Sequence, residues 1–144
     1  MAAMKGSRRS GEEINLPGVG VASNHRLSHA VPTIVFQGDR DHTVKQTNAQ
    51  AIVDQASKAY SAESAGVALS KSVAQGESPL GQTFSRTTYS DASGRARLEA
   101  WLVHGAGHAW SGGDASGSFT DRTGPDASAE MVRFFLAQSP VASA

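Results

Sequence analysis

The feature that most constrains the fold is a continuous run of β-branched and aromatic residues, Pro-Thr-Ile-Val-Phe, at positions 32–36. The run ends close to Gly38, and its length and composition predict a strand that is buried on both faces. Such strands are typical of sheets that other layers cover. A polar loop is expected at residues 38–44, directly after this strand.

Helical spacing of apolar residues follows the loop. Between residues 48 and 60 the apolar side chains recur with a helical period, which predicts a first helix. A second helix is predicted over residues 129–138, with Asp126 or Ser128 as its N-terminal cap. More than half of residues 61–82 are Ser, Ala or Gly. Because these residues have little bulk to bury, they predict a long surface loop or mobile segment.

A hairpin is predicted in the second half of the chain. Residues 83–90 and 96–104 flank the polar turn at 91–94, which contains a glycine, and a glycine-rich run follows at 105–113. Strands that alternate with helices predict the α/β class, with a parallel or mixed sheet. Three strands and two helices are too few to cover both faces of such a sheet, so we expect an incomplete domain.

Composition limits the domain count and the class of function. The 144 residues allow one domain at most, and we expect a flexible segment at 1–30, the domain portion at 31–138 and a tail at 139–144. The 13 Lys and Arg residues balance 13 Asp and Glu residues, so the chain lacks the basic surface that nucleic acid requires. Without cysteine there is no thiolate nucleophile or Cys-based zinc site.

Membrane insertion is not expected. The apolar runs are far shorter than the roughly 20 residues that span a bilayer. No apolar core of a signal peptide follows the basic residues near position 8.

Reactive side chains gather in three places. These are Asp39 and Asp41 with His42, the pair His104 and His108, and the pair His25 and His29. The stretch around His25 and His29 is weakly patterned, so a solvated loop is favoured there over a metal site. Asp39 and Asp41 either bond turn amides or face a ligand, since both follow the carboxyl end of a buried strand.

Asp41 and His108 together match two members of a hydrolase relay. The carboxylate fixes the imidazole tautomer, and the histidine moves the proton. In the α/β-hydrolase order, a serine in a G-x-S-x-G turn comes first, then the acid, then the histidine.

Four blocks of sequence carry a resemblance to a known family. They are residues 32–44 with Asn48, the Gly-Ala-Gly-His-Ala-Trp-Ser-Gly-Gly run at 105–113, residues 118–121 and residues 124–136. Over about residues 31–137 the chain resembles the C-terminal part of polyhydroxybutyrate depolymerase family esterases. The resemblance implies an α/β-hydrolase fold, with Asp41 as the acid and His108 as the base.

The resemblance also implies a substrate and a location. Family members are serine esterases, often secreted, so the expected substrates are carboxylic esters, small or polymeric, of the polyhydroxybutyrate, feruloyl or acetyl classes. Neither a cofactor nor a metal is expected. Trp110, close to the predicted base, either lines the acyl or alcohol pocket or covers the edge of the core.

The chain departs from the family pattern in several places. Gln37 replaces a usual histidine, and Lys45 and Gln46 stand where a proline is common. No G-x-S-x-G occurs anywhere in the sequence, and the nearest approach, at residues 76–81, has one residue too many. We therefore expect a chain that begins late in the fold, without the first strands, the nucleophile turn and the oxyanion loop, and without useful esterase activity alone.

Two other functions remain open. One is a non-catalytic remnant or binding module of the same fold. The other is a phosphatase of the haloacid dehalogenase type, because Asp39, Asp41 and Thr43 match its D-x-D-x-T signature, which works with Mg²⁺. Two residues separate the predicted strand from Asp39, whereas that family places its nucleophile directly at the strand end.

Overall fold

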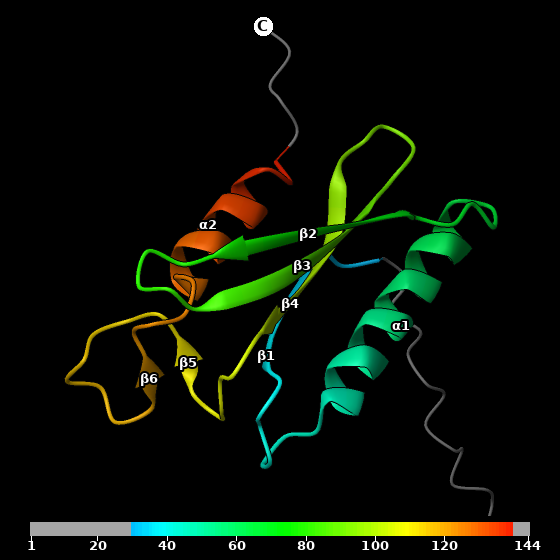
Figure 1. Cartoon of the computed structure of the whole chain (residues 1–144). Helices are drawn as coiled ribbons and strands as arrows, with labels where there is room; N and C mark the ends of the chain where they lie inside the picture. Colours follow the sequence, from blue (N-terminus) through cyan, green and yellow to red (C-terminus); the bar gives the residue numbers. More distant parts are fainter. Residues whose placement is uncertain (1–29, 140–144) are drawn as a thin grey trace, which may run out of the picture.

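The computed structural model describes residues 30–139, which form a small α/β domain (Figure 1). This part of the chain contains a mixed four-stranded sheet, two helices and a small two-stranded sheet. In chain order the elements are β1 (Thr33–Gly38), α1 (Gln46–Glu63), β2 (Ser70–Glu77), β3 (Thr83–Ser90), β4 (Ala96–Val103), β5 (Trp110–Ser111), β6 (Thr120–Asp121) and α2 (Ala127–Leu136).

The main sheet has the order β1-β4-β3-β2. β1 runs parallel to β4, whereas β3 is antiparallel to both β4 and β2. The predicted first strand, the hairpin and both helices are confirmed. The Asp126 side chain caps α2 by accepting the backbone N–H of Ala129.

The predicted loop at residues 61–82 is wrong. α1 continues to Glu63, and Ser70–Glu77 form β2, the outer strand next to β3. Almost every β2 residue is exposed. An exposed edge strand is held by backbone hydrogen bonds and needs no apolar side chains, so its composition resembles that of a loop.

The expected burial of β1 on both faces is also wrong. Most of its residues are only half-buried, and Gln37 is the buried one. β1 lies at the edge of the sheet, and among residues 30–139 no strand pairs with its outer side. Full burial is found instead in β4, where Leu98, Trp101 and Val103 are buried.

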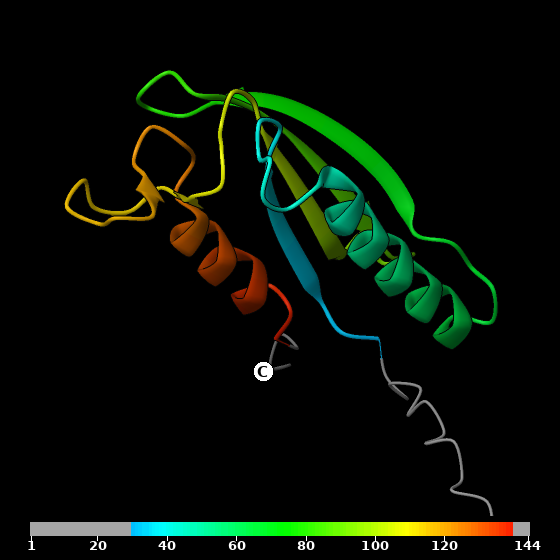
Figure 2. The ribbon, with the colours of Figure 1, turned by 90° about the horizontal axis from the view of Figure 1, so that it is seen from below.

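The two helices lie on opposite sides of the sheet (Figure 2). Glu99 of β4 binds Arg133 of α2 at 2.6 Å, whereas the next residue, Ala100, lines a cavity together with Val53 of α1. Successive strand residues point to opposite faces, so α1 and α2 cover different faces. Trp101, on the α2 side, stacks on Phe36.

Some expectations concern residues that the structure does not describe. The pair His25 and His29, nearly all of the segment at 1–30 and most of the tail at 139–144 lie outside residues 30–139. Within the described part, neither helix has the length and apolar character needed to cross a bilayer.

Candidate active site

The loop after β1 presents the carboxylate of Asp41. Its Oδ1 accepts the backbone N–H groups of Thr43 and Val44, each at 2.8 Å, and its Oδ2 lies 2.8 Å from Nδ1 of His108. The side chain is only 7% exposed. The hydrogen bond from the Val44 amide, followed by those from His108 and Thr43, lowers the pKa of Asp41 below its usual value. Asp41 is therefore ionised at neutral pH.

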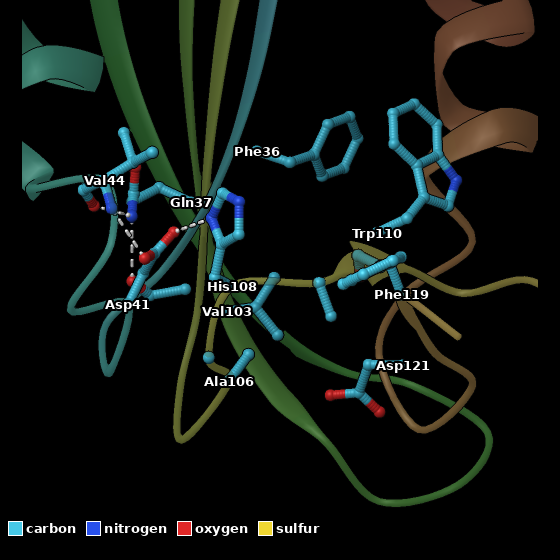
Figure 3. Close-up of a pocket in the computed structure, with 14 residues that line it drawn as sticks. Phe36, Gln37, Asp41, Val44, Val103, Ala106, His108, Trp110, Phe119 and Asp121 are labelled. Carbon is cyan, nitrogen blue, oxygen red and sulfur yellow. Dashed lines mark hydrogen bonds and ion pairs between the residues drawn. The ribbon is translucent and has the colours of Figure 1, made fainter. Parts of the chain in front are cut away.

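The loop after β4 presents the imidazole of His108. Because an ionised carboxylate only accepts hydrogen bonds, Nδ1 of His108 carries the hydrogen and donates it to Asp41. Nε2 then has a free lone pair and can accept a proton. The side chain is 55% exposed, and its ring lies between Asp41 and the space beside Phe36 (Figure 3).

Parallel pairing brings these two loops together. β1 and β4 are neighbours in register, with Gly38 opposite Val103, so both loops leave the same end of the sheet. The N–H of Arg40 donates to the carbonyl of Ala106 at 2.9 Å. A Cβ atom on Gly38 would collide with the carbonyl oxygens of Ala106 and Gly107, so only glycine permits this close approach.

The Asp41–His108 pair faces a cavity of about 460 Å³. Its wall is largely apolar and includes Phe36, Val103 and Phe119, with the carboxylate of Asp121 at one side (Figure 3). Trp110 lines this cavity too, and its indole N–H donates to the Ser128 hydroxyl at 3.3 Å. Trp110 therefore lines the cavity and contacts the start of α2, and it is exposed rather than part of the core.

Asp39 and His104 form a second pair and do not join the first. His104 Nδ1 lies 3.2 Å from Asp39 Oδ2, and its Nε2 lies 2.8 Å from the hydroxyl of Ser85 on β3. His42 is exposed. Sequence reasoning did not single out Ser85. The only signal for it was the predicted hairpin, whose register decides which residue of 83–90 lies beside His104.

The site offers no obvious place for a metal ion. Within residues 30–139 no group of three or more His, Cys, Asp or Glu side chains is arranged to hold one. Asp39 and Asp41 each bond a different histidine. This geometry does not favour a phosphatase of the haloacid dehalogenase type, in which both carboxylates act on one phosphate.

Comparison of the sequence with protein-family models and with curated proteins gives no significant match.

Proposed function

We propose that Asp41 and His108 are the acid and base of a serine-type carboxylic ester hydrolase of the polyhydroxybutyrate depolymerase kind. In this proposal the chain is the C-terminal part of an α/β-hydrolase fold. The observation that carries the proposal is the 2.8 Å contact between Asp41 Oδ2 and His108 Nδ1 at the carboxyl ends of two neighbouring parallel strands. Open α/β sheets bind their ligands at this edge.

The roles follow from the hydrogen bonds. Nε2 of His108 takes the proton from a nucleophilic hydroxyl as it attacks the ester carbonyl, and then gives it to the leaving alcohol. Asp41, held by the amides of Thr43 and Val44, stabilises the imidazolium that forms between these steps. Water then releases the acid by the same route in reverse.

The nucleophile in this proposal comes from outside the 144 residues, because none of them lies in a G-x-S-x-G turn. Two features of the described domain support the proposal that further elements pack against it. The outer side of β1 has backbone groups that another strand can pair with. Val132, Phe135 and Leu136 are exposed on α2 and, with Trp110, line an apolar hollow of about 460 Å³.

The shape and lining of the cavity beside His108 support an ester substrate. Aromatic side chains, Phe36, Trp110 and Phe119, form much of its wall. Flat apolar surfaces of this kind suit feruloyl, hydroxybutyryl or acetyl groups.

The test is to translate the gene upstream of Met1 in the same frame. The proposal expects an apolar strand followed by G-x-S-x-G, and a fluorophosphonate probe should label that serine in the protein expressed from the longer frame. An absent or out-of-frame motif would contradict the proposal and leave the chain a non-catalytic remnant or binding module of this fold.

A further inference from the structure

A complete chain of hydrogen bonds links Ser85, His104 and Asp39. The Ser85 hydroxyl lies 2.8 Å from His104 Nε2, and His104 Nδ1 lies 3.2 Å from Asp39 Oδ2. The other carboxylate oxygen, Oδ1, accepts the backbone N–H of Gly105 at 2.7 Å. These distances lie within the range of ordinary hydrogen bonds between side chains, apart from the slightly long contact to Asp39.

The donors and acceptors available on each side chain fix the direction of these hydrogen bonds. An ionised Asp39 can only accept, so Nδ1 of His104 carries the hydrogen of the neutral imidazole. Nε2 is then the acceptor, and the Ser85 hydroxyl must donate to it. This is the tautomer in which a histidine serves as the base for a serine.

The sheet register brings the three residues to one face near the end of the strands. Asp39 and His104 each directly follow a member of the Gly38–Val103 pair, whereas Ser85 of β3 pairs with Leu102, two residues before His104. Because residues two apart on a strand share a face, Ser85 lies diagonally beside His104. Ser85 lines a cavity with Val35 and Leu102, on the α1 side of the sheet. Phe36 and Val103 line the cavity of the Asp41–His108 pair. Ser85 and the Asp41–His108 pair therefore line different cavities, which have Gln37 in common.

Ser85 opens into a cavity that can take a small acyl group. The cavity is about 210 Å³, smaller than the roughly 300–1,000 Å³ of sites for drug-sized ligands. Its lining combines apolar side chains with amide side chains, among them Val35, Ala49, Val53, Leu102, Gln37 and Gln46. An acyl group of a few carbons fits this space.

We propose that Ser85 is a second nucleophile, activated by His104 and Asp39, which accepts short acyl groups from activated esters. The Ser85 oxygen forms a bond to the ester carbonyl carbon as its proton passes to His104 Nε2. The bond to the leaving alcohol then breaks, and the same proton passes to the departing oxygen. The products are acyl-Ser85 and the free alcohol. This site shares no residue with the Asp41–His108 pair and does not depend on the proposed function.

Acylation of Ser85, rather than rapid turnover, is what these three residues can perform themselves. Efficient hydrolysis also uses donors that stabilise the oxyanion, and these contribute a large share of the rate in serine hydrolases. A good leaving group such as p-nitrophenolate compensates for weak oxyanion stabilisation, because less negative charge must be stabilised on the acyl oxygen.

The experiment is acylation of the whole folded chain by p-nitrophenyl acetate. We expect a burst of one p-nitrophenolate per chain, and mass spectrometry should find one acetyl group on the peptide that contains Ser85. Ser85→Ala should remove the burst. Ser72→Ala is the matched control, because Ser72 is an exposed serine on the neighbouring strand β2, and its burst should be unchanged.

Two histidine variants test whether His104 acts as the base for Ser85. His104→Ala should slow acylation of Ser85 about 100-fold or more, the usual contribution of a general base. His42→Ala, which changes an exposed histidine outside both pairs, should leave it unchanged. Acetyl groups on other residues only, a burst that survives in Ser85→Ala, equal rates in His104→Ala, or no burst from folded protein would each overturn the proposal. Circular dichroism of every variant checks that the fold is retained.

Discussion

The two carboxylate–imidazole pairs at the end of the sheet are built from the same parts and yet differ in completeness. In each, the acid follows β1 and the histidine follows β4. The Asp41–His108 pair joins an acid that is 7% exposed to a histidine that is 55% exposed. The Asp39–His104 pair is about one-third exposed at both members, and its histidine is already bonded to Ser85.

The difference shows how a small shift along a loop changes what a pair can do. Asp39 comes directly after Gly38, at the start of the turn, and its histidine meets the hydroxyl of Ser85 on the adjoining strand β3. Asp41 lies at the end of this turn, where two backbone amides hold its carboxylate and its histidine faces the cavity. In our proposals the Asp39–His104 pair acts on Ser85 of the same chain, and the Asp41–His108 pair acts on a nucleophile from outside these 144 residues.

The largest expected effect distinguishes the role of Asp41 from that of Asp39. In the protein expressed from the longer reading frame, Asp41→Asn should lower kcat for p-nitrophenyl butyrate by about 10⁴-fold, because an amide favours the wrong tautomer of His108. Asp39→Asn should change it by less than about tenfold, since Asp39 is bonded to the other histidine. Equal losses in the two variants would break the distinction between the pairs.

Gly38→Ala tests the contact that both pairs share. A new Cβ would push away the carbonyl oxygens of Ala106 and Gly107, so we expect a loss of about 1–3 kcal/mol in the free energy of unfolding. Chemical denaturation measures it. Gly107→Ala is the control in the same contact, because a Cβ there meets no atom within 4 Å. If Gly38→Ala leaves the free energy of unfolding unchanged, the two loops do not pack as described.

A smaller effect concerns the acidity of Asp41. Removal of its hydrogen-bond partner in His108→Ala should raise the pKa of Asp41 toward the usual value, although the stronger bond from the Val44 amide keeps it lowered. The carboxyl carbon followed by NMR reports this titration. His42→Ala, which changes an exposed histidine next to Asp41, should leave it unaltered.

The same hydrogen bonds give the stability a defined pH dependence. The pKa values of Asp41 and Asp91 are lowered on folding, by the Val44 amide for Asp41 and by the Ser93 hydroxyl for Asp91. Groups with a lowered folded pKa stabilise the fold above their unfolded pKa. The melting temperature should therefore stay constant near neutral pH and decrease once the pH drops below about 4. Asp91→Ala should weaken this fall if the account is correct.

Sequence alone predicts the parts of the fold that leave an apolar pattern. β1 and the β3–β4 hairpin carry β-branched and aromatic residues, and both helices carry a helical period. β2 is not predicted, because its exposed residues carry no apolar pattern. Asp41 and His108 stand out because each follows a strand, whereas Ser85 is one of many serines. Only the register that places Phe84 opposite Val103 shows that Ser85 reaches His104.

The most direct test of the central claim is the turnover of p-nitrophenyl butyrate by the protein that carries the upstream nucleophile. Our account predicts that His108→Ala lowers kcat by about 10⁴-fold or more, while His42→Ala and His104→Ala retain kcat within about tenfold of the parent protein. Full activity in His108→Ala would contradict it, because the open imidazole would then play no part in ester hydrolysis.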